Sequence, residues 1–126
     1  MFKNLLSSIG FEDVEVETRI NQQTYHPADT IEGLIELKGR ADHIDYIEVQ
    51  LVERVENQDK SSDFETFDHV LSKVHLTTET EQTLHFQLEG PHNIQSAESQ
   101  FFIMTHVYIK NSVDAYDDDE IFFAES

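Results

Sequence analysis

The sequence predicts an all-β protein: an antiparallel, immunoglobulin-like β-sandwich of about seven strands with a short N-terminal helix. Apolar residues alternate with polar ones in several short segments. This alternation is typical of strands that place one face against a core and the other in water. Turn-forming residues separate the segments, and no interior stretch shows convincing helical spacing, which favours a sandwich.

The clearest alternation lies in residues 31–56. Its first half has apolar or small residues two apart, and its second half has apolar residues on one parity: Ile31, Gly33, Ile35 and Leu37, then Ile47, Val49, Leu51 and Val55. Gly39 and Asp42 lie between the halves and are typical of a short loop. We therefore predict two antiparallel strands that pair with each other as a hairpin.

Further segments complete the prediction. Residues 2–9 have apolar side chains at helical spacing, which predicts a short helix capping one open end of the core. Strands are expected at 14–20, 70–76, 84–88, 101–110 and 121–124, and loops at 21–30, 57–66 and 89–100. The length indicates one domain over 1–126, with the helix in 1–10 and the sandwich in 11–126. The expected core includes Ile35, Leu37, Val49, Leu51, Val74, Phe86 and Ile103.

The composition restricts the partners. The formal net charge is −18, from 26 acidic and 8 basic residues, which opposes binding to nucleic acid or to an anionic membrane surface. No apolar run approaches the ~20 residues that span a bilayer, so no membrane span is expected. The chain has no cysteine, which permits a reducing compartment.

Several segments resemble a known family. They are the opening FKNLLSSIG, then VEVETRI, the stretch IEGLIELKGRADHIDYIEVQLVE and the closing THVYIKNSVDAYDDDEIFF. Together they resemble, in the same order, the SpoOM family of sporulation-control proteins of bacilli and their relatives, which have an arrestin-like fold. VDAYDDDEI is similar to the family's aspartate-containing turn that leads out of its first domain, whereas Gly39-Arg40 stands in place of its double glycine. The resemblance implies the N-terminal half of a non-catalytic, cytoplasmic regulator that acts through protein contacts.

An acidic cluster near the end of the chain is one candidate metal site. It comprises Asp114, Asp117, Asp118, Asp119 and Glu120. Clustered carboxylates suit Ca²⁺, which takes six to eight oxygen ligands. The cluster lacks the glycine that an EF-hand loop needs, so we favour a solvated acidic turn before the last strand.

The histidines are a second candidate. A hairpin between 70–79 and 82–89 would place His75 opposite His85, with their Cβ atoms about 5 Å apart. Zinc sites usually have three or four protein ligands, and His106 is a third histidine that spacing does not place. We favour two exposed cross-strand histidines and expect no metal.

Catalytic patterns are missing from the sequence. No serine lies in a Gly-x-Ser-x-Gly setting, and no cysteine is present to act as a nucleophile. Paired carboxylates mean little in so acidic a chain. We therefore expect no catalytic residue and no cofactor, and a non-enzymatic interaction module whose strand edges and loops bind a partner. The alternative is a small-ligand-binding sandwich with an apolar cleft between its sheets.

A surplus of apolar side chains predicts an interface. The segment 101–110 is apolar on both parities, and 121–124 carries two adjacent phenylalanines. Only one side of a strand can face a single core, so some of these groups are expected at the surface. The expected interface residues are Phe102, Met104, Tyr108, Phe122 and Phe123, and we predict a homodimer through this surface or the adjacent strand edge.

Overall fold

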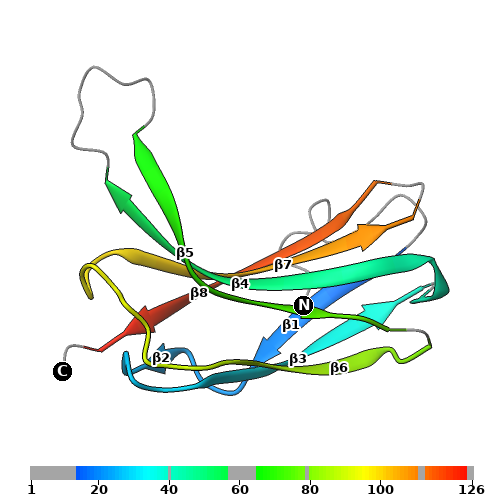
Figure 1. The fold of residues 1–126 in the computed structure, drawn as a ribbon, viewed down its shortest axis with the longest axis horizontal. Coiled ribbons are helices and arrows are strands. Elements are labelled where there is room, and N and C mark those ends of the chain that lie inside the picture. Colours follow the sequence, from blue (N-terminus) through cyan, green and yellow to red (C-terminus); the bar gives the residue numbers. More distant parts are fainter. Residues whose placement is uncertain (1–13, 40, 57–64, 79, 111–112, 125–126) are drawn as a thin grey trace.

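Eight strands make up most of the described chain (Figure 1). The computed structural model describes residues 14–39, 41–56, 65–78, 80–110 and 113–124. The strands are β1 (Glu15–Ile20), β2 (Thr24–Tyr25), β3 (Ile31–Lys38), β4 (Ile44–Glu56), β5 (Thr66–Leu76), β6 (Thr83–Leu88), β7 (Gln100–Ile109) and β8 (Ala115–Phe123). Within these ranges the only helical element is the single 3₁₀ turn η1 (Ala41–His43), so no described helix is long and apolar enough to cross a membrane. The helix expected at 1–10 lies outside the described residues.

The strands form two sheets, ordered β1-β3-β6 and β2-β8-β7-β4-β5. All pairs are antiparallel except β2–β8, which is parallel. The predicted hairpin between 31–38 and 47–56 is therefore wrong, because β3 and β4 belong to different sheets. Gly39 has a φ of 108°, a left-handed conformation that favours glycine, and η1 follows it. This connection carries the chain across to the other sheet.

The core lies between the two sheets, where their inward-facing apolar side chains form one cluster. Six of the seven expected core residues are buried: Ile35, Leu37, Val49, Leu51, Phe86 and Ile103. Val74 is only partly buried, although it packs against the cluster. It lies on β5, the last strand of its sheet, so a neighbouring strand covers it on one side only.

The alternation of β4 breaks in its middle. The pairing of β4 with β5 shifts between Leu51 and Val52, as at a β-bulge. Beyond the shift Val52 and Glu53 are both buried, whereas Val55, which was expected on the core side, is partly exposed. The Glu53 carboxylate accepts hydrogen bonds from the backbone N–H groups of Gln95 and Ser96, at 2.9 to 3.2 Å. Glu53 lies on the same parity as the buried Leu51, and its buried carboxylate anchors the 89–99 loop.

Candidate interaction surface on the five-stranded sheet

The face of the five-stranded sheet that points away from the core carries most of the expected interface residues. Phe102 and Met104 of β7 lie opposite Val52 and Gln50 of β4, on the parity that alternates with the buried residues. Tyr108 shares that parity. Side chains from β4 and β7 thus gather on one outer face.

Alternation separates the two expected phenylalanines of β8. Phe122 is 48% exposed, whereas Phe123 is buried and packs edge-on against Phe101, with ring centroids 4.7 Å apart. Four of the five expected residues therefore lie outside the core. Phe123 belongs to the core and is not available to a partner in the folded chain.

Aromatic and histidine rings form a continuous row across this outer face. The order is Tyr116, His106, Tyr108, Tyr46 and His75, from four neighbouring strands, with centroid separations of 4.2, 3.7, 4.2 and 5.0 Å. Burial, together with a hydrogen bond to Tyr46, raises the pKa of Tyr108 to about 12. The row was missed by sequence reasoning, although Tyr108, Tyr116 and His106 lie on outward parities of their strands.

Carboxylates fix both histidines of the row. His106 Nε2 lies 2.8 Å from Asp114 Oδ2, and His75 Nε2 lies 2.7 Å from Glu48 Oε2. The predicted pairing of His75 with His85 is wrong, because β5 pairs with β4 while His85 of β6 lies opposite Leu34 in the other sheet. In the described ranges no three histidine, aspartate or glutamate side chains are close enough to hold a metal ion.

The acidic segment is not the turn that the sequence predicts. Residues 115–120 form most of β8, so their side chains alternate between the two faces. Asp117 is buried and its Oδ2 accepts a hydrogen bond of 2.6 Å from the backbone N–H of Thr18. Burial and the neighbouring Asp119 raise the pKa of Asp117 to about 6. Asp117 shares its parity with Ala115, Ile121 and Phe123, a signal that sequence reasoning could have used.

The ends of β4 and β5 form a two-stranded ribbon, residues 52–56 and 66–70. Its outer part, beyond the last pairing of β4 with β7 at Arg54 and Gln100, extends past the other strands (Figure 1). Phe67 and Val70 are 46% and 52% exposed. Arg54 forms a bidentate pair with Asp68 at 2.7 and 3.0 Å, and its guanidinium lies 4.7 Å from the centre of the Phe102 ring. The hydrogen bond from Arg54 lowers the pKa of Asp68.

The edge of this ribbon is open. No described strand pairs with β5 on the side away from β4. Arg54, Thr66, Phe67 and Asp68 line a shallow hollow of about 430 Å³ beside it. The ribbon therefore combines unpaired strand edge, exposed apolar side chains and a surface hollow.

Comparison with known proteins agrees with the resemblance seen in the sequence. The family model described as "SpoOM protein" matches residues 2–124. A solved structure, "Crystal structure of Spo0M, sporulation control protein, from Bacillus subtilis", matches with a TM-score of 0.71 and 21% sequence identity. The match covers 90% of this chain and 50% of that one, so this chain spans about half the length of the solved protein. No curated protein matches significantly. Because the family model covers nearly all of the sequence, the chain belongs to the SpoOM family.

Proposed function

We propose that this chain is a non-catalytic, sporulation-related regulator that acts by binding another protein, and that the open edge of β5 is its binding site. The observation that carries the proposal is the exposure of residues 65–70 at the edge of the five-stranded sheet. An exposed strand edge presents unpaired backbone N–H and C=O groups, which an extended segment can satisfy by adding a strand. Membership of the sporulation-control family supports a regulatory role.

The side chains of the ribbon support this mode of binding. Val52 lies opposite Val70 and Val55 lies opposite Phe67, so both faces of the ribbon carry apolar groups next to the open edge. A strand added to β5 would place alternate side chains beside Val70 on one face and beside Phe67 on the other. Backbone bonds would supply affinity, and these two apolar sites would select the partner's residues.

Charge indicates the chemistry of the partner. The guanidinium of Arg54 is already paired with Asp68, whereas Glu56 and Glu65 are exposed at the ends of the ribbon strands. The whole chain carries a net charge of −18. An extended segment with apolar residues at alternate positions and lysine or arginine between them fits this surface best. Its association rate should fall as salt is added.

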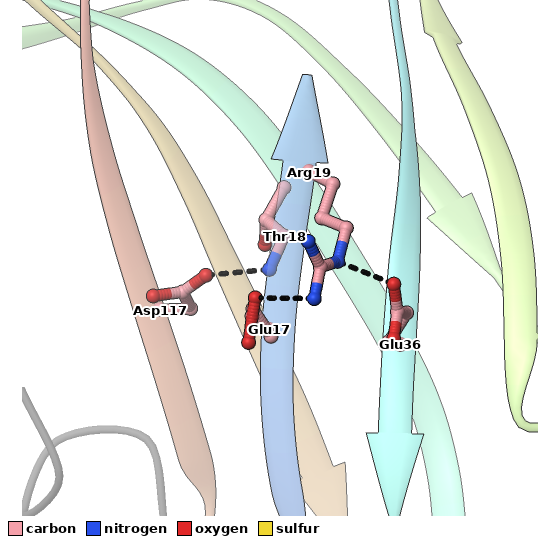
Figure 2. A network of polar contacts seen from close by, with 5 residues as sticks. All are labelled: Glu17, Thr18, Arg19, Glu36 and Asp117. Atoms are coloured by element: carbon pink, nitrogen blue, oxygen red, sulfur yellow. Dashed lines mark hydrogen bonds and ion pairs between the residues drawn. The ribbon is translucent and has the colours of Figure 1, made fainter. Parts of the chain in front are cut away.

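The rival functions have weaker support. A small-ligand site between the sheets needs an apolar cleft, but the described inner faces pack into one core cluster. Described hollows of about 350 to 430 Å³ lie at the surface and include charged or polar side chains. The hydrogen bond that holds the buried Asp117 carboxyl comes from the backbone N–H of Thr18 and not from a base (Figure 2), which favours a non-catalytic role. A second copy of this chain could pair through β5, but its equal negative charge opposes this.

A pair of matched substitutions tests the proposal. Val70→Lys places a positive charge at the open edge, whereas Val113→Lys changes another exposed valine, 61% exposed, ahead of β8. Both should fold, because neither valine is buried. Each variant would be used as bait in a lysate of the source organism, with quantitative mass spectrometry of captured proteins. We expect a specific set of proteins lost with Val70→Lys and retained with Val113→Lys. Equal capture by both variants would contradict the site, and light scattering of the unmodified protein would reveal a second copy as the occupant.

A further inference from the structure

His92 is buried where two connections and the end of β8 meet. It lies in residues 89–92, directly after β6, and is only 5% exposed. Its backbone N–H donates a hydrogen bond of 2.7 Å to the carbonyl of Pro27, and its ring lies 5.9 Å from the ring of Phe123, measured between centroids. Residues 89–92 therefore pack against the 26–30 connection, which joins β2 to β3, and against the end of β8.

The contact between the two connections is close. A Cβ atom at Gly90 would lie 2.6 Å from the backbone oxygen of Ala28 and 2.7 Å from that of Asp29. The His92 ring binds the same Asp29 oxygen, which lies 2.9 Å from Nε2. A carbonyl oxygen can only accept a hydrogen bond, so Nε2 carries the proton of the neutral ring.

The other ring nitrogen of His92 has no hydrogen-bond partner. Nδ1 is buried, and no group in the described parts of the chain bonds to it. It is an acceptor in the neutral ring and becomes a donor when the ring is protonated. A buried N–H without an acceptor, on a ring that then carries a charge, is costly. The closed arrangement therefore accepts the neutral ring and disfavours the protonated one.

The charges around the ring do not reverse this preference. The titratable groups on the elements around it are those of Tyr25, His26, Asp29, Glu53 and Glu89. Within the described residues Asp29 alone acts on the charge of His92, and β8 presents the uncharged ring of Phe123. Burial lowers the pKa of His92 below its ordinary value of 6.5, and the bond to the Asp29 carbonyl and the Asp29 charge offset this only in part.

We propose that His92 is a pH-sensitive switch, which keeps residues 89–92 closed over the end of β8 when neutral and releases them when protonated. Release breaks the bonds to Pro27 and Asp29, hydrates the ring and uncovers Phe123, an aromatic residue that the closed protein buries. The Glu53 carboxylate still holds Gln95 and Ser96, which confines the opening. The switch lies away from the β5 edge and does not rest on the function proposed for that edge.

The direction of the pH dependence follows from linkage. Because the pKa of His92 is lowered in the closed state, the open state binds more protons as the pH falls below about 6.5. The closed state is fully favoured above this pH and loses its advantage below it. One proton limits the effect to about tenfold per pH unit, so opening should increase by at most about tenfold from pH 7.5 to 5.5.

Hydrogen exchange measured by NMR tests this directly. The protection factor of the residue 92 amide, corrected for intrinsic exchange, would be measured from pH 7.5 to 5.5. We expect a fall of about 3- to 10-fold in the unmodified protein. His92→Gln keeps a donor for the Asp29 carbonyl but cannot be protonated, so its protection should not show this fall. His26→Gln changes an exposed histidine of the facing connection and should keep the fall.

Two further measurements keep the test decisive. Val49 lies in the middle of the five-stranded sheet, and its amide should stay better protected than that of residue 92, because the switch opens while the sheet stays paired. His92→Phe keeps a ring that cannot be protonated and replaces the glutamine variant if that proves unstable. The proposal is overturned if residue 92 exchanges as slowly as Val49, or if the folded His92 variants keep the pH dependence of the unmodified protein.

Discussion

Gly33→Ala should destabilise the protein, although glycine in the middle of a strand is usually improved by alanine. Gly33 lies in β3 opposite Ile20 of β1 and opposite Phe86 of β6. A Cβ atom at this position would lie 2.5 Å from the backbone oxygen of Arg19 and 2.7 Å from two atoms of the Phe86 ring. Both contacts are shorter than real Cβ atoms tolerate, and the first is with backbone.

Two opposing free energies decide the sign. Replacing a strand glycine by alanine gains about 0.5 to 1 kcal/mol through the unfolded chain and strand propensity. Overpacking a well-filled core costs about 1 to 3 kcal/mol, and here the buried Phe86 ring and the β1 backbone must both shift. The net loss is expected near the upper end, about 2 kcal/mol. With an unfolding entropy of roughly 2.1 cal/mol/K per residue, a chain of this length should lose about 8 °C in Tm.

Calorimetry and urea unfolding of Gly33→Ala measure this loss. Glu32→Ala is the matched control, because Glu32 is the exposed neighbour whose side chain points away from the core, and its effect should stay within about 0.5 kcal/mol. If Gly33→Ala were as stable as the unmodified protein or more so, the close packing of β1, β3 and Phe86 around this glycine would be refuted.

Three further predictions concern the core, the buried acid and the outer face. Leu51→Ala, at a fully buried site, should cost about 2 to 5 kcal/mol in urea unfolding, and Val74→Ala clearly less; equal losses would contradict the assignment of β5 as an edge. Ionising the buried Asp117 carboxyl should destabilise the folded protein by up to about 3 kcal/mol as the pH rises from about 4 to 6, because its pKa is raised in the folded state. Asp117→Asn should remove this loss, so the free energy of unfolding of the variant relative to the unmodified protein should rise with pH. A difference between the two proteins that stays flat with pH would contradict this. Phe123→Glu should unfold the domain in thermal melts, whereas Phe122→Glu should leave it folded and, if the outer face forms a dimer, give monomers in light scattering.

The sequence contains much of the information on burial and little on pairing. Alternation correctly marked Ile35, Leu37, Leu51 and Ile103 as core, because burial depends on which side of a strand a residue occupies. Which strands pair depends on the path that each connection takes between one strand and the next. The same Gly39 that suggested a hairpin turn instead leads β3 and β4 into different sheets.

The same contrast between burial, which local alternation predicts, and strand pairing, which it does not, applies to the candidate surface. The doubly apolar β7 correctly indicated side chains left over on an outer face, and alternation along β8 separates Phe122 from Phe123. The open edge of β5 follows from the order of strands in the sheet, which no local pattern contains. The burial of Asp117 was missed because the high acidic content suggested a solvated turn. Its position in β8, on the same parity as Ile121 and Phe123, nevertheless predicts an inward-facing side chain.

The most direct test of the central claim uses an unbiased library of extended peptides displayed on phage and selected on the purified protein. Enriched peptides would be synthesised and their binding sites mapped by NMR. The account predicts basic peptides with alternating apolar residues, amide shifts concentrated in 66–70, and intermolecular contacts to the backbone of β5. It also predicts that Val70→Lys weakens binding at least tenfold and that Val113→Lys does not. Enriched peptides that bind elsewhere, or that bind Val70→Lys as tightly as the unmodified protein, would contradict β5 as the partner site.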